Sequence, residues 1–202
     1  MKGLIYKDIC SLSKQLKLFG AMILIFAIFL PDGMSTFGLI YVGMLPITAL
    51  AYDERSKWNK LAAMMPYSKT ELVLSKYVLS YGMIFIAFVA WIAIRAALSL
   101  FTDAAFNADV LLLGLAAAAA STVIVSINLP MMIRFGVEKA RLLFIAISVV
   151  VAIGATVLAE TQAAEVGVSA SLPVVLLVAV GVVALNLLSA FLSVKLYRGA
   201  EA

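Results

Sequence analysis

The sequence contains no histidine and a single cysteine, Cys10, and only 13% of its 202 residues are charged. One cysteine cannot form an intramolecular disulfide, and without histidine there is neither a Cys/His metal cluster nor a Ser/His or Cys/His nucleophile pair. Carboxylate-only metal sites stay open, but the acidic residues are scattered. Phosphate-binding loops and dinucleotide-binding glycine motifs are also missing. We therefore expect no catalytic residue, metal site, cofactor site or nucleotide-binding domain in this chain.

Long apolar runs dominate what is present. Hydrophobic residues make up 65% of the chain, and the mean hydropathy is +1.13. A soluble domain is about half apolar and about a quarter charged, so lipid must solvate much of this chain. A bilayer core needs about 20 helical residues. The apolar runs cover 18–30, 37–52, 78–101, 110–133, 142–159 and 172–196.

The last four runs each predict one membrane span, whereas the first two are short. The turn signal Pro31-Asp32-Gly33 between them favours two spans joined by a tight hairpin, with a re-entrant pair as the alternative. Six spans place 14 of the 15 Lys and Arg residues on one side, and the loops of the other side carry none. The remaining basic residue, Arg95, lies inside the third run.

This charge pattern predicts the topology. By the positive-inside rule the basic side is cytoplasmic. The sequence thus predicts an all-α integral membrane protein with six transmembrane helices, cytoplasmic N- and C-termini, and one domain over 1–202. The net charge of +4 is too modest to indicate nucleic-acid binding. The charged residues of the opposite loops are all acidic, namely Asp32, Asp103, Asp109, Glu160 and Glu165.

The N-terminal segment 1–17 predicts a helix lying in the membrane interface. An apolar stripe recurs at helical spacing and the charged residues fall outside it, as expected for an amphipathic interfacial helix. The stripe consists of Ile5, Ile9, Leu12 and Leu16, and the residues outside it are Lys7, Asp8, Lys14 and Lys17.

The polar segment 53–76 predicts two cytoplasmic features. Trp58, Leu61, Ala62 and Met65 fall at the spacing of a short amphipathic helix, which Pro66 should end. The stretch Ser68-Lys69-Thr70-Glu71 matches a capping box, with Ser at the N-cap and Glu at N3. The third transmembrane helix should therefore begin near Lys69 and extend below the bilayer.

Three segments together resemble the permease subunits of ABC-2 type transporters. The resemblance is strongest to the short, six-span branch with the permeases of bacterial peptide exporters, such as the phenol-soluble modulin exporter. It covers the topology of the whole chain, and its specific residues fall within the segments 2–8, 52–77 and 130–141, which total about 45 positions. The matching residues lie in 2–8, in 52–58 with Pro66 and 72–77, and in Pro130 with 134–141.

The resemblance implies a permease of the bacterial plasma membrane that pairs with a second copy of itself or a related permease. Each permease docks a cytoplasmic ATPase, which binds ATP and Mg²⁺. Segment 1–17 becomes the elbow helix, and 53–66 becomes the coupling helix between spans two and three. The implied coupling residues are Asp53, Glu54, Ser56, Lys57, Trp58, Lys60, Leu61, Met65 and Pro66, joined by Arg134, Glu138, Lys139 and Arg141 of the second cytoplasmic loop.

Plainer interpretations remain open for each candidate. Segment 53–66 is alternatively an ordinary basic loop with an interfacial helix, and the second loop is basic on topological grounds alone. Arg95 either lines a substrate path, pairs with Asp103, or extends to the outer surface. Trp58 and Met65 are the side chains expected to fill an apolar groove of the ATPase.

The function expected is ATP-driven export of an amphipathic or hydrophobic substrate, with a small peptide, toxin or antimicrobial first. The absence of a large outer loop favours export over uptake. The alternatives are an ATP-independent carrier or channel, a lipid-modifying enzyme, and an ATPase-coupled immunity or sensing complex. A carrier needs a polar path, for which only Arg95 is available, and a lipid enzyme needs clustered Asp, His or Cys, which the sequence lacks.

Overall fold

The computed structural model describes residues 2–29, 36–100, 107–142 and 172–197. All regular elements within these ranges are helices, so the predicted all-α class is confirmed for them. Residues 137–142 are also helical. The helices are α1 (Lys2–Phe29), α3 (Phe37–Val42), α4 (Leu45–Arg55), α5 (Trp58–Ala63), α6 (Lys69–Ser99), α7 (Ala108–Phe135) and α9 (Leu172–Leu196).

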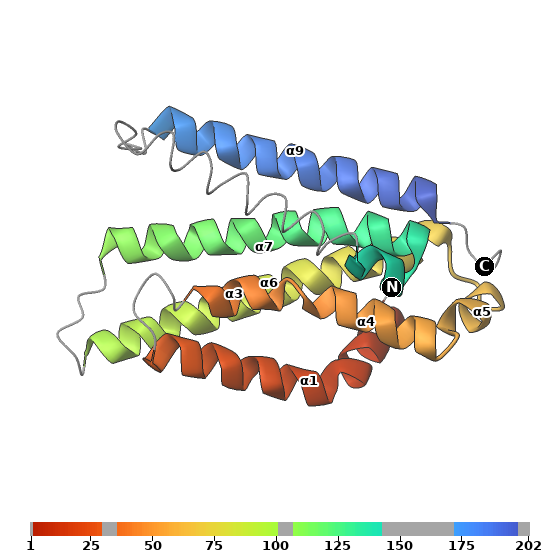
Figure 1. Ribbon diagram of the computed structural model, residues 1–202, viewed down its shortest axis with the longest axis horizontal. Coiled ribbons are helices and arrows are strands. Elements are labelled where there is room, and N and C mark those ends of the chain that lie inside the picture. Colours follow the sequence, from red (N-terminus) through yellow and green to blue (C-terminus); the bar gives the residue numbers. More distant parts are fainter. Residues whose placement is uncertain (1, 30–35, 101–106, 143–171, 198–202) are drawn as a thin grey trace.

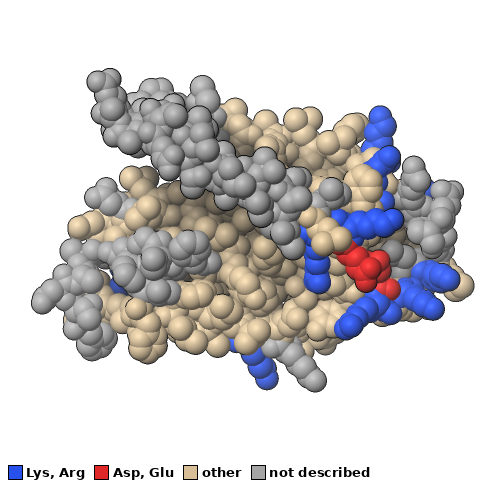
Figure 2. All heavy atoms as spheres, viewed as in Figure 1, with Lys and Arg blue, Asp and Glu red and all other residues tan. Residues whose placement is uncertain are grey.

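The long helices pack into an elongated bundle (Figure 1). Helix α6 contacts α1, α7 and α9, and α7 also contacts α3 and α9. The start of α1 and the end of α9 lie at the end of the bundle that carries α5, whereas α6 ends and α7 begins at the opposite end (Figure 1). Figure 2 shows Lys and Arg gathered around an acidic patch at the α5 end, which we name the charged end.

Three of the described helices are long and apolar enough to cross a membrane: Lys69–Ser99, Val110–Phe135 and Ala179–Leu196. A fourth is added if the two arms of α1, Gly3–Ser13 and Gln15–Phe29, count as one span despite the 67° bend between them. Most of the fifth predicted span, 142–159, lies outside the described residues, as do the hairpin 31–33 and the outer loop 160–171. The six-span topology stays a prediction.

The predicted second span, 37–52, is not one continuous helix. It consists of α3 and the first part of α4, separated at Gly43 and Met44. Pro46 explains the break, because in a continuous helix its ring would clash with the carbonyl of Val42, four residues earlier. The broken segment packs tightly on α7: a Cβ atom on Gly43 would lie 3.2 Å from the carbonyl oxygen of Ser121.

The predicted faces of the first helix are partly wrong. Leu12 of the apolar stripe is fully buried in the bundle, but Asp8, assigned to the polar face, is also buried and only 1% exposed. The buried face therefore includes a carboxylate. The reason is a pair of basic partners, one of them on another helix, which are described below.

Helix α6 begins where the capping box predicted. The Ser68 side chain accepts a hydrogen bond from the backbone N–H of Glu71 at 3.2 Å, and the Glu71 carboxylate accepts one from the N–H of Ser68 at 3.0 Å. These bonds satisfy two of the otherwise unpaired donors at the helix start. The 31 residues of α6 span about 46 Å at 1.5 Å per residue, more than the roughly 30 Å of a bilayer core.

Polar side chains join α6, α7 and α9 inside the bundle. Pro130 lies inside α7 and has no N–H to donate to the carbonyl of Ser126, four residues earlier. The hydroxyl of Ser189 on α9 donates to that carbonyl instead, at 2.5 Å. The side chains of Ser126 and Tyr81 both donate to Oδ1 of Asn186. Polar groups between membrane helices form hydrogen bonds with one another in this way, because no water is present to pair with them.

Close packing between α6 and α7 gives a first prediction. A Cβ atom on Gly114 would lie 2.4 Å from a ring carbon of the fully buried Trp91, whereas one on Gly82 would meet nothing within 4 Å. We expect Gly114→Ala to destabilise the protein by about 1–3 kcal/mol through overpacking. Gly82→Ala, the matched control, should be neutral or stabilising by up to about 1 kcal/mol. Thermal unfolding in detergent measures both, and equal melting temperatures for the two variants would contradict this packing.

Candidate functional site

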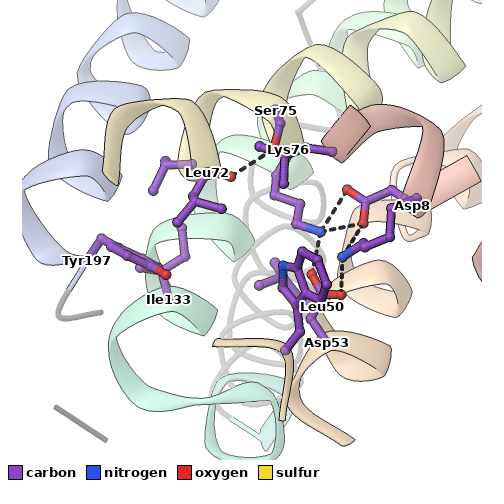
Figure 3. Close-up of a pocket in the computed structure, with 12 residues that line it drawn as sticks. Asp8, Leu50, Asp53, Leu72, Ser75, Lys76, Ile133 and Tyr197 are labelled. Carbon is purple, nitrogen blue, oxygen red and sulfur yellow. Dashed lines mark hydrogen bonds and ion pairs between the residues drawn. The ribbon is translucent and has the colours of Figure 1, made fainter. Parts of the chain in front are cut away.

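Four charged side chains form a closed ring at the charged end. Lys76 Nζ lies 2.7 Å from Asp8 Oδ2 and 2.5 Å from Asp53 Oδ2. Lys7 Nζ lies 2.9 Å from Asp8 Oδ1 and 2.5 Å from Asp53 Oδ1. Each charge therefore has two neighbours of opposite sign, and Figure 3 shows Lys76 pointing toward both Asp8 and Asp53. We name these four residues the charge ring.

The charge ring is largely removed from water. Asp8, Asp53 and Lys76 are 1%, 6% and 8% exposed. Burial of unpaired charge is very costly, and here two positive and two negative groups offset one another. Burial disfavours the charged amine of Lys7, but hydrogen bonds and negative charge from Asp53 and Asp8 outweigh it and raise its pKa above 10.5. Lys7 thus stays protonated at neutral pH.

The four residues of the charge ring come from three segments that are far apart in the sequence. Lys7 and Asp8 come from the short arm of α1, Asp53 from the last turns of α4, and Lys76 from the second turn of α6. Tyr197, just after α9, lines the same small cavity (Figure 3). Burial and the negative charge of Asp53 raise the pKa of the Tyr197 phenol.

Helix α5 is attached to the charge ring through Trp58. The Nζ atom of Lys7 lies 4.3 Å from the centre of the Trp58 ring, within the range of a cation–π interaction. Lys57, between α4 and α5, adopts a left-handed backbone conformation with φ of 54°. That conformation costs a non-glycine residue about 1–2 kcal/mol, so the chain reversal before Trp58 depends on contacts that hold it.

The predicted apolar stripe of α5 is divided between two faces. Trp58 is half-buried and Ala62 is buried, whereas Leu61 and Met65 are 50% and 39% exposed. Met64, which the spacing did not select, is 85% exposed. Leu61, Met64 and Met65 form what we name the exposed apolar tip, and the basic side chains of Lys57 and Lys60 are exposed beside it.

Glu54 joins this segment to the second predicted cytoplasmic loop. Its Oε2 atom accepts a hydrogen bond of 2.8 Å from the backbone N–H of Val137, at the start of the helical residues 137–142. The preceding Gly136 has φ of 80°, and a Cβ atom there would lie 3.3 Å from Glu54 Oε1. Only glycine adopts this backbone readily and allows the carboxylate to approach.

A depression of about 430 Å³ lies between the two segments. Basic side chains of both contribute to its wall, with Lys57 and Lys60 on one side and Arg134 on the other. Among the residues that the structure describes, no three His, Cys, Asp or Glu side chains are grouped to hold a metal ion.

Comparison with known protein families identifies the chain. A family model described as "ABC-2 family transporter protein" matches residues 3–198, which is nearly the whole sequence. The chain belongs to the ABC-2 transporter family. No curated protein and no solved structure matches it. The resemblance seen in the loops is thus confirmed at the level of the family, and this ABC-2 protein is the membrane subunit of an ABC transporter.

The coupling residues predicted from the resemblance gather at the charged end of this ABC-2 permease. Asp53 is in the charge ring, Glu54 joins the two loops, and the Ser56 hydroxyl donates to the carbonyl of Asp53 at 3.2 Å. Arg95 does not join them, since it is on the part of α6 nearest the opposite end. Its predicted partner Asp103 lies outside the described residues. The exposed members are Glu54, Ser56, Lys57, Lys60, Leu61, Met65, Pro66, Arg134, Glu138, Lys139 and Arg141.

Sequence reasoning missed three members of the charge ring: Lys7, Asp8 and Lys76. A signal was available, because the N-terminal segment is otherwise basic. Asp8 stands alone among four lysines of the first 17 residues, and an isolated acid in a basic segment suggests an ion pair. The identity of its partner was not available, since Lys76 is 68 residues away.

The contact between the two loops gives a second prediction. Removing the Glu54 carboxylate leaves the Val137 N–H without its acceptor and should loosen residues 134–141. We expect Glu54→Ala to be cut several-fold faster by trypsin after Arg134, Lys139 and Arg141. Arg55→Ala, at the exposed neighbouring position, is the matched control and should be cut there at the wild-type rate. Equal rates in the two variants would contradict the role of Glu54.

Proposed function

We propose that this ABC-2 permease couples a separate cytoplasmic ATPase to the export of an amphipathic or hydrophobic substrate, and that α5 is its coupling helix. One observation carries the proposal: an exposed apolar tip stands at the charged end of the molecule, among basic side chains rather than in the apolar part of the bundle. The ATP and Mg²⁺ would bind the partner.

The exposed apolar tip is expected to bind a surface of a partner protein. Leu61 on the six-residue helix α5 and Met64 at its C-cap are large apolar side chains, 50% and 85% exposed. Anchors of this kind, seated in a pocket of the partner, dominate the binding energy of protein interfaces. Lys57 and Lys60 flank the tip, which suits an apolar pocket with an acidic rim.

The second loop is proposed to contribute to the same interface. The bond from Val137 to Glu54 joins the loop to the end of α4, and Arg134 and Lys60 line one depression. An ATPase seated on α5 would thus also meet residues 134–141. We name as the docking surface the exposed apolar tip together with Lys57, Lys60 and the exposed basic residues of that loop.

The direction of transport and the stoichiometry are further parts of the proposal. The loops predicted for the outer side are short, which provides no domain for capturing an external ligand and favours export. Two ATPases act in concert in ABC transporters of the resembled branch, so we expect two copies of this permease, or one with a related partner. A small peptide is the first substrate to test.

The apolar tip gives a third prediction. We expect Leu61→Asp combined with Met64→Asp to weaken ATPase binding by at least about tenfold, because two anchors are lost and charge is placed in an apolar pocket. Ser13→Asp combined with Lys17→Asp, at two exposed positions in α1, is the control and should bind normally. Binding is measured by co-purification of the ATPase at equal permease expression. Normal binding by the tip variant would exclude α5 as the main docking element.

The proposal as a whole is tested by gentle purification of the chain from its native membrane and identification of the proteins that accompany it. An ATPase with a phosphate-binding loop, in a one-to-one ratio, is the expected result. A chain that purifies without any ATPase would overturn the proposal and favour an ATP-independent carrier or channel. Flux of a candidate peptide in vesicles then separates export from an immunity or sensing role.

A further inference from the structure

We propose that the charge ring fixes the coupling helix α5 to the short arm of α1 and to the base of α6, so that these three elements move as one body during the ATP-driven cycle. Lys7, Asp8, Asp53 and Lys76 are then positioning residues, which act on the docking surface through Trp58. The inference rests on the proposed function, because it assigns a mechanical role within the same site.

The closed pattern of the charge ring is the first argument. In an isolated ion pair, rotation of one side chain separates the two partners. Here each amine contacts both carboxylates and each carboxylate contacts both amines, over four distances between 2.5 and 2.9 Å. Relative displacement of α1, α4 or α6 would therefore stretch at least two ion pairs in a buried setting, where charge interactions are strong.

The small size of α5 is the second argument. A helix of six residues has no stability of its own, because helix nucleation is unfavourable and few hydrogen bonds follow it. Its orientation must come from its contacts. Among the described residues, its contacts include the Trp58 ring against Lys7 and the buried Ala62, and the short left-handed connection at Lys57 precedes it. The strongest directional contact thus leads from α5 to the charge ring.

The cost of burying charge is the third argument. Buried ion pairs are often no more stabilising than apolar side chains of similar volume, because desolvation offsets the attraction between the charges. Stability alone would be served by leucine or methionine at these positions. Four charges with defined directions instead specify one relative placement of the three segments, which is what a force-transmitting unit requires.

The chain offers a direct way to measure this placement. Cys10 is its one cysteine and is exposed on the short arm of α1, and Lys60 is exposed on α5. Spin labels on Cys10 and on a Lys60→Cys position therefore report the separation of the two elements across the charge ring. The labelled chain is diluted with unlabelled Cys10→Ser chain, so that pairs between two copies do not contribute.

Pulsed electron spin resonance is recorded on the permease–ATPase complex in nanodiscs, without nucleotide and after trapping with ADP and vanadate. With the charge ring intact we expect one narrow distance distribution that does not shift between the two states. Asp53→Asn combined with Lys76→Met, which keeps the net charge, should broaden it and make it shift on trapping. That variant should retain bound ATPase but lose permease-dependent stimulation of hydrolysis.

Two further variants keep the inference testable if the double variant fails to fold. Trp58→Leu leaves the charge ring complete but removes the cation–π contact, and should also broaden the distribution, whereas Trp58→Phe keeps an aromatic face and should restore it. Tyr81→Phe combined with Ser126→Ala is the matched control, since it removes partly buried hydrogen bonds elsewhere on α6 and α7. It should leave the distribution narrow.

The outcomes separate this inference from the proposed function. A shift on trapping with the charge ring intact, or narrow distributions in both the Asp53/Lys76 and Trp58→Leu variants, would overturn the inference while docking stands. Absence of any bound ATPase would overturn the proposed function. In that case the distance distributions between the two spin labels, recorded without nucleotide, still show whether the charge ring fixes α5 to α1.

Discussion

The charge ring is the constraint on which the charged end of this protein depends. Burial of the Asp8 carboxylate, which is 1% exposed, would be costly without partners, and Lys76 and Lys7 provide them from two segments. Loss of one member of a buried ion pair typically costs about 3–5 kcal/mol, because a buried charge is left unpaired. The same contacts that make burial tolerable thus determine where α1, α4 and α6 meet.

Helix α6 extends this constraint into the membrane part of the bundle. Lys76 contacts α1 and α4, while the next residue, Tyr77, places its hydroxyl 2.7 Å from the hydroxyls of Ser189 and Ser193 on α9. One turn later, Tyr81 donates to Asn186. Movement of the base of α6 would therefore reach α9 through directed hydrogen bonds, and not only through apolar packing, which permits sliding. This gives the proposed coupling at α5 a defined route into the bundle.

The features that the sequence predicted correctly are those set by composition or by neighbouring residues. The helical class follows from the apolar runs, and the start of α6 follows from Ser68 and Glu71, three residues apart. The errors concern burial that depends on distant partners. Asp8 was assigned to the polar face because Lys76 lies 68 residues away, and the contact between Trp58 and Lys7 was missed because it is a tertiary one. Pro46, by contrast, was a local signal for the break between α3 and α4 that the hydropathy of the run concealed.

The proposed coupling depends on an ATPase that sits on the exposed apolar tip. The most direct test replaces Met64 with a photoreactive amino acid, irradiates intact cells, and identifies the covalent product. We expect a product with a cytoplasmic protein that carries a phosphate-binding loop, and none when the photoreactive residue replaces the exposed Leu100 at the other end of α6. If the photoreactive residue at position 64 forms a product only with lipid, in cells that express the transporter, an ATPase does not sit on the tip.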